Sequence, residues 1–487
     1  MHSLARLDHR YLWHPFTQMR DWLKHEPIVI MGGEGARLWD AHGREYLDAN
    51  SSIWTNLHGH NHPRINTAIR RQLGKIAHSS ALGLANEPAA RLAERLVESA
   101  PPALSKVFFS DNGSTAMEVA LKLAYEFARR TGQSRKPKFL GLEGAYHGDT
   151  VGAVSLGHID LFHKAYSGLL FKSDKVMAPY CYRCPFNRAR PERADAREYR
   201  KCNWECVGKL EQKFAAQKKK GNPYAAFVVE PLMQGAAGMI PQPAGWLSRA
   251  AEIARAHGAL LIADEVMTGF GRTGVSAVRE GERPREPRHL QKSGLAGTLA
   301  LPLFACQREG VQPDFMALAK GLTGGYLPMA ATLTTQAVFD AFLGEYDEFK
   351  TFFHGHSFTG NQLGAAAGLA SLELLQSHGS IRARRQLEQT LRDELKTLWR
   401  YPTVGDIRQV GLVAGVELVR NWRTREPFEL RERAGIRVCE AMARLGVLTR
   451  PIGNVVVVMP PYCTTPAEAR RIVAALGEAV VGLSKSR

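Results

Sequence analysis

The sequence lacks an apolar run long enough to cross a bilayer or to form the core of a signal peptide. Its longest nearly apolar stretch, residues 295–306, is interrupted by Gly and Thr, whereas a membrane helix needs about 20 apolar residues. The first residues, 1–8, also have no apolar core, so a cytoplasmic location and no membrane partner are expected. The odd number of cysteines, seven, argues against a full framework of disulfides. A GxxxxGK[ST] motif is absent as well, which argues against nucleotide hydrolysis.

The charge is strongly unbalanced toward the positive side. The chain has 487 residues, 64 Lys+Arg against 47 Asp+Glu, and a net charge of +17, a balance that is typical of proteins that bind nucleic acids or anionic surfaces. Two stretches, 181–220 and 275–302, carry more than half of the excess. Nucleic-acid binding would need an aromatic-interleaved basic surface or a recognition helix, and neither is legible in the sequence. We therefore expect two surface insertions and no nucleic-acid partner.

Apolar segments that suit buried strands alternate with amphipathic segments that suit helices. Strands are expected at 106–110, 225–230, 259–264, 315–319 and 455–459, and the clearest helix at 115–130. This alternation predicts the α/β class, with a mostly parallel sheet that helices cover on both faces. In such sheets ligands bind at the carboxyl ends of the strands, so the residues that follow each strand are the candidates for chemistry.

A lysine, Lys320, follows the expected strand 315–319 and precedes a glycine-rich turn. At the ligand edge of a sheet partial desolvation lowers the pKa of a lysine and leaves its amine neutral. A neutral amine is the form that attacks a carbonyl carbon. A single lysine at the end of a strand is more often simply solvated, so this segment alone leaves both interpretations open.

A carboxylate, Asp264, ends the expected strand 259–264, just before the glycine-rich residues 269–274. A buried carboxylate is costly unless a cation or hydrogen bonds satisfy it. A metal ion, a helix N-terminus or a protonated pyridine nitrogen are the partners that this position allows.

Residues 110–115 end one strand and begin the amphipathic helix. Thr115 with Glu118 fits a capping box, and the free N–H groups around Gly113 and Ser114, together with the helix dipole, suit a phosphate. A helix that is simply well capped is an equal alternative for this segment.

Tyr146 and His147 lie between glycines in residues 144–148. Tyr146 could stack on a flat ring, and His147 could orient that ring or a substrate, although ordinary loop packing is the alternative. Together the four segments supply a phosphate site, a stacking aromatic, a carboxylate and a lysine. These are the requirements of pyridoxal phosphate.

In this order, these residues resemble the class III aminotransferases of the fold-type I pyridoxal phosphate group. Further matching segments are LWHPFTQM at 12–19, GFGRTG at 269–274, HGHSFTGN at 354–361, TRPIG at 449–453 and MPPY at 459–462. The resemblance covers nearly the whole chain outside the two basic stretches. It implies a large domain with a mostly parallel sheet, residues 76–365, and a small α+β domain built from both chain ends, residues 1–75 and 366–487.

The resemblance also implies a role for each matching residue. Lys320 would bind pyridoxal phosphate and then carry the transferred proton, and Asp264 would pair with the pyridinium nitrogen. Gly113 and Ser114 would hold the phosphate, and Tyr146 would stack on the ring. Lys320, Asp264 and Tyr146 are thus the expected catalytic residues.

A second copy of the chain is implied by residues 355–357. Gly355, His356 and Ser357 resemble a segment that reaches into the site of the neighbouring subunit, with Ser357 on the phosphate. The expected assembly is a homodimer whose active sites are shared across the subunits.

The resemblance implies that three other residues bind the substrate or line its channel. Arg450 resembles the residue that binds the carboxylate of 8-amino-7-oxononanoate, a bidentate role that suits a guanidinium, and Trp54 and Ile53 would line the channel. The implied reaction aminates this oxo acid to 7,8-diaminononanoate in biotin synthesis. Adenosylmethionine is the expected amino donor. Lysine remains an alternative donor, because Phe16 and Ile53 stand where many members of the family have tyrosine and tryptophan. The alternative is another ω-aminotransferase that acts on a diamine or an ω-amino acid.

Four cysteines in the first basic stretch have the spacing of a structural zinc site. They are Cys181, Cys184, Cys202 and Cys206. Four reduced cysteines in a surface insertion are the more frequent alternative, and the implied reaction needs no catalytic metal.

Overall fold

A seven-stranded sheet forms the centre of the computed structural model, which describes residues 1–274 and 302–484. Its strands, in spatial order, are β4 (Leu104–Ser110), β12 (Ala330–Thr335), β11 (Phe315–Leu318), β10 (Leu260–Asp264), β7 (Tyr224–Val229), β5 (Lys138–Leu142) and β6 (Asp174–Val176). β10 is parallel to β7 and β11, and β5 is parallel to β7 and β6, whereas β12 runs antiparallel to both of its neighbours. The predicted α/β class with a mostly parallel sheet is therefore confirmed.

Side chains of β7 alternate between two cores on opposite faces of the sheet. Ala226 and Val228 pack with α6 (Gly113–Arg130), while Phe227 and Val229 pack with α10 (Glu205–Lys219) and α11 (Trp246–Ala256). An all-apolar strand is what a parallel sheet covered on both faces requires. α10 lies in the first basic stretch, so this half of the predicted insertion belongs to the helical cover of the sheet. The second predicted insertion, 275–302, lies outside the described residues apart from Pro302.

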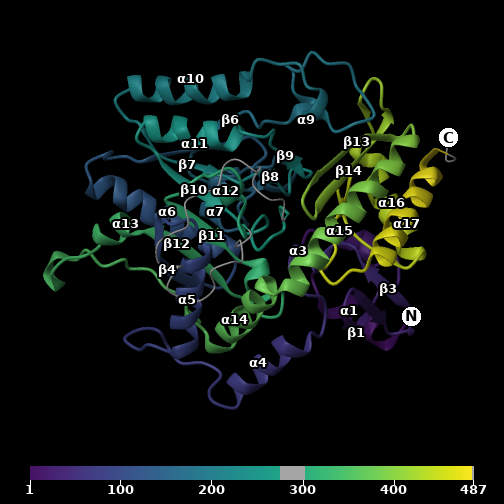
Figure 1. The fold of residues 1–487 in the computed structure, drawn as a ribbon, viewed down its shortest axis with the longest axis horizontal. Helices are drawn as coiled ribbons and strands as arrows, with labels where there is room; N and C mark the ends of the chain where they lie inside the picture. The colour runs from purple at the N-terminus through teal and green to yellow at the C-terminus, as the bar shows by residue number, and fades with distance from the viewer. Residues whose placement is uncertain (275–301, 485–487) are drawn as a thin grey trace.

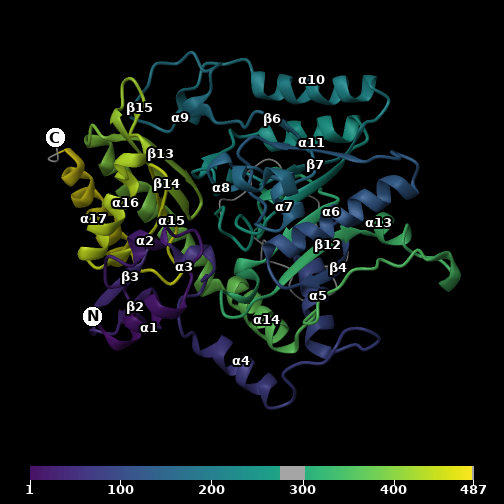
Figure 2. The ribbon, with the colours of Figure 1, turned by 180° about the vertical axis from the view of Figure 1, so that it is seen from behind.

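A smaller unit joins the two ends of the chain. β1 (Ile30–Glu34), β2 (Arg37–Asp40) and β3 (Glu45–Asp48) form a sheet with β16 (Val447–Leu448), in which Leu47 pairs with Val447. In Figures 1 and 2 the purple N-terminal strands lie beside the yellow C-terminal helices in both views. The small domain built from both chain ends is thus confirmed, and its boundaries at residues 75 and 365 stay predictions.

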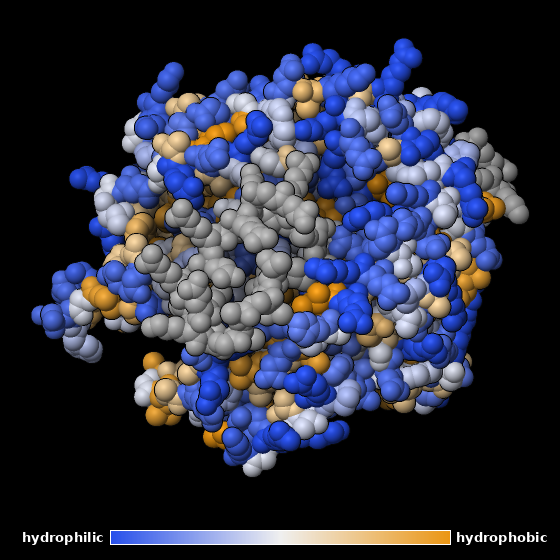
Figure 3. All heavy atoms as spheres, viewed as in Figure 1, coloured by the Kyte–Doolittle hydropathy of each residue, from blue (hydrophilic) through white to orange (hydrophobic). Residues whose placement is uncertain are grey.

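The C-terminal part adds a second antiparallel sheet and its helices. Its strands and helices are β13 (Val404–Val410), β14 (Val413–Asn421), β15 (Glu426–Pro427), β17 (Pro451–Ile452), β18 (Val455–Val458), α14 (Gln362–Gln376), α15 (His378–Lys396), α16 (Ala434–Arg444) and α17 (Pro466–Ser484). The other helices and strands are α1 (Ser3–Tyr11), α2 (Met19–Trp22), α3 (Ser51–Trp54), α4 (Pro63–Leu73), α5 (Glu87–Ser99), α7 (Val151–Leu156), α8 (Asp160–His163), α9 (Ala196–Tyr199), α12 (Ala305–Arg308), α13 (Gln336–Asp340), β8 (Met233–Gln234) and β9 (Ile240–Pro241). On the face drawn in Figure 3 hydrophilic residues predominate, and apolar residues form separate small patches. Among the helices of the described residues, none has the length and apolar character needed to cross a membrane.

Candidate active site

A cavity of about 680 Å³ opens where β5, β7, β10 and β11 end, at the carboxyl edge that the strand pattern predicts. Six of the predicted site residues line it: Trp54, Gly113, Ser114, Tyr146, Asp264 and Lys320. They come from five separate segments, and the parallel strands bring them together because all of these strands end on the same side.

Asp264 at the end of β10 is fixed by two bonds. Its Oδ2 lies 2.7 Å from Nδ1 of His147, and its Oδ1 accepts a bond from the backbone N–H of Val266 at 3.0 Å. The side chains of His147 and Asp264 are 0% and 6% exposed, and Nε2 of His147 is buried without a hydrogen-bond partner. A carboxylate held in this way offers a fixed negative charge to a cationic ring nitrogen.

Lys320 follows β11 and faces this carboxylate across the cavity. Burial lowers the pKa of Lys320, and the charges of Asp264 and Glu230 oppose the shift. Its Nζ lies 5.0 Å from the centre of the Trp54 ring, and its backbone has a φ of 36°. A non-glycine residue in the left-handed region is strained, which is common where a side chain must point at a ligand. The depressed pKa favours the neutral, nucleophilic amine that the sequence predicts.

The N-terminus of α6 lines the cavity through Asn112, Gly113 and Ser114. The N-cap is Asn112, whose side chain accepts from the backbone N–H of Thr115 at 3.1 Å. The predicted capping box of Thr115 with Glu118 is therefore wrong: the helix begins earlier, and Glu118 accepts from Gly152 N–H at 2.8 Å instead. The start at Gly113 leaves the first N–H groups of the helix facing the cavity, as an anion requires.

Two glycines keep this end of the cavity tight. A Cβ on Gly113 would lie 2.7 Å from a methyl group of Val266, and a Cβ on Gly148, whose φ is 118°, would lie 2.0 Å from Oγ of Ser114. Ser114 in turn accepts a bond from the backbone N–H of Asp149 at 3.2 Å. The segments at Gly113–Ser114, Gly148–Asp149 and Val266 thus approach one another closely and form a narrow cradle at the start of α6. A larger side chain at either glycine would fill it.

Tyr146 is anchored at both ends. Its hydroxyl donates to Asp149 at 2.6 Å, and its backbone N–H donates to Glu230 at 3.1 Å. Its ring is stacked on the imidazole of His163, with centroids 6.1 Å apart and planes at 13°. Burial, with Asp149 next in effect, raises the pKa of Tyr146, so the phenol stays protonated. The ring is therefore a fixed flat wall of the cavity.

Glu230 is a buried cavity residue that the sequence analysis does not single out. It follows β7, is 5% exposed, and accepts bonds from the backbone N–H groups of Tyr146 and Gly235 at 3.1 and 2.8 Å. Burial raises the pKa of Glu230 to about 7; the charge of His147 opposes this shift and that of Asp264 adds to it. Its position in the sequence could have identified it, because Glu230, like Asp264, is a carboxylate at the end of an apolar strand.

Residues 51–54 form a left-handed turn that presents Trp54 to the cavity. Ser51, Ser52, Ile53 and Trp54 have φ values of 47°, 47°, 63° and 71°. The turn is closed by bonds from Trp54 N–H to Asn50 O and from Thr55 N–H to Ser51 O, both at 2.9 Å. Each left-handed non-glycine residue costs about 1–2 kcal/mol. No motif in the sequence predicts this conformation, because none of the four residues is a glycine.

The other predicted residues do not line the cavity of this chain. Ile53 is 45% exposed, and Arg450 is exposed beyond β16. Ser357 is also exposed, and His356 lies 3.1 Å from Asp111 at the mouth of the cavity. The segment 355–357 therefore runs past the entrance and does not enter the site of its own chain.

Pyridoxal phosphate fits this arrangement in charge and shape. The fixed carboxylate of Asp264, the desolvated amine of Lys320 and the glycine cradle at α6 are features that a flat ring with a pyridine nitrogen, a carbonyl group and an anionic phosphate uses. Gly113, Ser114, Tyr146, Asp264 and Lys320 would hold it.

The cysteines of the first basic stretch are all free. Cys181 is buried, and Cys184, Cys202 and Cys206 are partly exposed. Within residues 1–274 and 302–484, no three or more His, Cys, Asp or Glu side chains are placed to hold a metal ion. The zinc hypothesis therefore gains no support from their arrangement.

Comparison with known proteins gives consistent matches over the length of the chain. The family model described as aminotransferase class-III matches residues 19–282 and 293–480. A protein of Geobacter sulfurreducens named adenosylmethionine-8-amino-7-oxononanoate aminotransferase is 47% identical over 478 residues, which are 98% of this chain and 97% of the relative. A protein of Aquifex aeolicus with the same name is 42% identical over 483 residues, 99% of this chain and 98% of the relative.

Solved structures agree with the sequence matches. The crystal structure of adenosylmethionine-8-amino-7-oxononanoate aminotransferase from Methanocaldococcus jannaschii superposes with a TM-score of 0.85 at 37% identity and covers 98% of both chains. An ω-transaminase from Pseudomonas jessenii, solved in complex with PMP, has a TM-score of 0.86 at 28% identity and covers 99% of both chains.

Proposed function

Because the chain belongs to the class III aminotransferase family, we propose that it aminates 8-amino-7-oxononanoate to 7,8-diaminononanoate, a step of biotin synthesis, with pyridoxal phosphate as its cofactor. The chain is an enzyme of the aminotransferase type, and its family is dependent on this cofactor. The observation that carries the proposal is the meeting of the Lys320 amine, the Asp264 carboxylate and the α6 N-terminus in one cavity. The names of the full-length relatives support the substrate.

When bound, pyridoxal phosphate supplies an electron sink that stabilises negative charge on the carbon from which a proton leaves. Lys320 would hold the cofactor through its amine nitrogen and would accept and return that proton. The depressed pKa of Lys320 is suited to both tasks, because a neutral nitrogen attacks a carbonyl and accepts a proton.

Asp264 would pair with the ring nitrogen through its carboxylate. The bonds to His147 and Val266 hold this carboxylate in place, so little reorganisation is needed as charge develops. Tyr146 and Val266 would enclose the two faces of the ring, and the Gly113 N–H and Ser114 would bind the phosphate. Walls of this kind restrict water and orient the substrate.

Arg450 is proposed to bind the substrate carboxylate. A guanidinium matches a carboxylate with two parallel bonds, and an exposed side chain leaves it free to close over a ligand. Trp54, which lines the cavity, and Ile53 beside it would form the channel between this arginine and Lys320.

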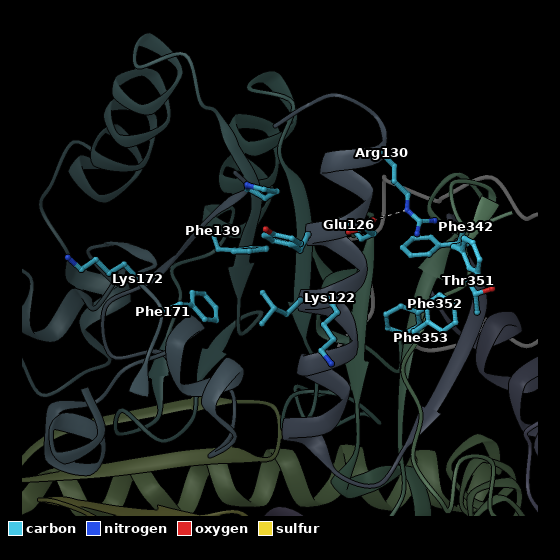
Figure 4. Close-up of a pocket in the computed structure, with 14 residues that line it drawn as sticks. Lys122, Glu126, Arg130, Phe139, Phe171, Lys172, Phe342, Thr351, Phe352 and Phe353 are labelled. Carbon is cyan, nitrogen blue, oxygen red and sulfur yellow. Dashed lines mark hydrogen bonds and ion pairs between the residues drawn. The ribbon is translucent and has the colours of Figure 1, made fainter. Parts of the chain in front are cut away.

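A homodimer is proposed to complete the site, with Ser357 of the partner subunit on the phosphate. Phe349 and Phe353 are 68% and 75% exposed, and with Phe342 and Phe352 they line a second hollow of about 640 Å³ beside α6. Figure 4 shows Phe342, Phe352 and Phe353 on one side of α6 and Phe139 and Phe171 on the other. An exposed aromatic surface of this size is typical of a protein interface. Sedimentation equilibrium that finds a monomer with full activity would contradict this part of the proposal.

The decisive experiment is an assay of 7,8-diaminononanoate formation with adenosylmethionine and lysine offered separately, and with Lys320→Ala as the blank. Product with either donor supports the proposal and identifies the donor. No product with either, but turnover of a diamine or an ω-amino acid, would replace it by the broader ω-aminotransferase function. The proposed location stays the cytoplasm, where free cysteines persist.

A further inference from the structure

The left-handed turn at residues 51–54 needs an external cause. Ser51, Ser52, Ile53 and Trp54 all have a Cβ that clashes with the following carbonyl in this conformation, and glycine is the residue that adopts it freely. Such a segment persists when its surroundings hold it, and strained segments concentrate at functional sites.

The carboxylate of Asp48 is the main group that holds the turn. Its Oδ1 accepts bonds from the backbone N–H groups of Asn50 and Ser52, at 3.1 and 3.2 Å. Its Oδ2 accepts from the hydroxyl of Ser52 at 3.1 Å. Asp48 is the last residue of β3 and 3% exposed, so the rigid sheet fixes the carboxylate before the turn begins.

His60 and Asn56 secure the carboxylate from the other side. Nε2 of His60 lies 3.0 Å from Oδ2 of Asp48. The amide of Asn56 donates to Nδ1 of His60 at 2.9 Å, which leaves the proton of the neutral imidazole on Nε2, where it donates to Asp48. Every polar group in this chain of contacts therefore has a partner.

Two further bonds hold the turn, one to a distant part of the chain and one to the residue just before it. The Ser51 hydroxyl donates to the carbonyl of Met459 at 2.6 Å, next to the end of β18. The Trp54 indole N–H donates to the side chain of Asn50 at 2.9 Å. These bonds fix the direction of the indole, whose ring centre lies 5.0 Å from Nζ of Lys320.

We propose that Asp48 is a positioning residue of the active site: by holding residues 51–54 in the left-handed turn, it places the Trp54 ring against the Lys320 amine and sets the width of the substrate channel. Without this hold the four residues would favour the right-handed region, which relieves the Cβ–carbonyl clash, and the indole would lose its present position against Lys320. The effect on catalysis rests on the function proposed above, whereas the effect on the turn does not.

A double-mutant cycle on Tm tests whether Asp48 stabilises the turn, without any assay of activity. Asp48→Ala should lower Tm by several degrees. Ser52→Gly should raise Tm in the Asp48→Ala background, because glycine relieves the positive φ and the bond to Asp48 is already lost. In the wild-type background the same change should raise Tm less, because it also removes the bond from the Ser52 hydroxyl to Asp48. An equal effect of Ser52→Gly in both backgrounds would overturn the proposal.

The position of Trp54 can be followed by acrylamide quenching of tryptophan fluorescence, taken as the difference from a Trp54→Phe variant. Asp48→Ala should increase the quenching of this component. The matched control is Asp40→Ala: Asp40 is a buried carboxylate of the neighbouring strand that accepts from His42 N–H, Arg44 N–H and the Tyr46 hydroxyl. The control should lower Tm but leave the quenching of Trp54 unchanged.

Kinetics then separate positioning from mere stability. Asp48→Asn, which keeps one acceptor oxygen and so is the milder change, should raise KM for 8-amino-7-oxononanoate by about tenfold with kcat reduced less than threefold. Binding of pyridoxal phosphate, measured by absorbance titration, should stay within twofold of wild type. An Asp48→Asn enzyme with unchanged KM, or one whose KM changes no more than that of Asp40→Asn, would overturn the proposal. Failure of the wild type to use this substrate would reject the proposed function and leave the stability and quenching tests intact.

Discussion

His147 and Asp264 are 117 residues apart in the chain, yet Nδ1 of His147 lies 2.7 Å from Oδ2 of Asp264 at the wall of the cavity. The contact joins the loop after β5 to the end of β10, and it fixes the carboxylate on the side away from solvent. The charge of Asp264 is therefore available in one direction, toward the cavity.

Asp264→Asn should lower kcat by about 100- to 1000-fold, the usual cost of removing one preorganised electrostatic group from an active site. Asparagine keeps an oxygen that can accept from Val266 N–H, so folding should be retained. The measurement is steady-state turnover of 8-amino-7-oxononanoate with Tm as a check on folding. A reduction of kcat below threefold would mean that the charge of Asp264 is not used.

Lys320→Ala should abolish product formation while leaving the fold intact, because the variant loses the amine that is proposed to hold the cofactor and move the proton. After borohydride reduction in the presence of pyridoxal phosphate, mass spectrometry of the wild-type protein should find the cofactor on the peptide that contains Lys320. The matched control, Lys209→Ala on the exposed side of α10, should retain both labelling and turnover. Labelling of another lysine in the wild type would reject the assignment.

Gly113→Ala should weaken the binding of pyridoxal phosphate by tenfold or more, since its Cβ would lie 2.7 Å from a Val266 methyl group and would push that side chain into the site. The expected loss corresponds to about 1.4 kcal/mol or more. Gly208→Ala in α10 is the control, because a Cβ there meets no atom within 4 Å. It should stabilise the protein by roughly 0.5–1 kcal/mol and leave cofactor binding unchanged. Equal cofactor affinity in both variants would contradict the predicted cradle.

Glu230 should make the free energy of unfolding depend on pH. Burial raises its pKa from 4.5 to about 7, so between these pH values the folded chain keeps a proton that the unfolded chain has released. Stability contributed by this group is thus fully present below pH 4.5 and is lost as pH rises to about 7, a loss on the order of 3 kcal/mol.

The test compares urea unfolding of the wild type and of Glu230→Gln across this pH range. The glutamine variant has no titrating group at this position, so its stability should fall less steeply as pH rises. Glu94→Gln on the exposed side of α5 is the control and should leave the slope unchanged. A slope in Glu230→Gln as steep as in the wild type would show that Glu230 is not the group that titrates.

The strand-end residues were accessible to sequence reasoning because their signal is local. A run of apolar residues predicts a buried strand, and Asp264 and Lys320 follow such runs directly. Parallel strands end at one edge, so the pattern alone predicts that the two side chains meet. The start of α6 was less accessible: Asn112 and Thr115 both suit a cap, and the choice between them depends on where β4 ends.

By itself, then, the sequence determined the α/β class, the order of the main strands along the chain and most of the candidate catalytic groups, because periodicity and strand ends are properties of short segments. Only the tertiary structure decided the hand of the turn at 51–54, the pairing of His147 with Asp264 and the proton affinity of Glu230. Each of these depends on atoms from distant segments: Ser51 is held by the carbonyl of Met459, 408 residues away, and the pKa of Glu230 is raised by the burial that the whole fold creates. The conformational preferences of short segments do not reflect such distant contacts. For residues 51–54 these preferences favour the right-handed conformation and not the left-handed one.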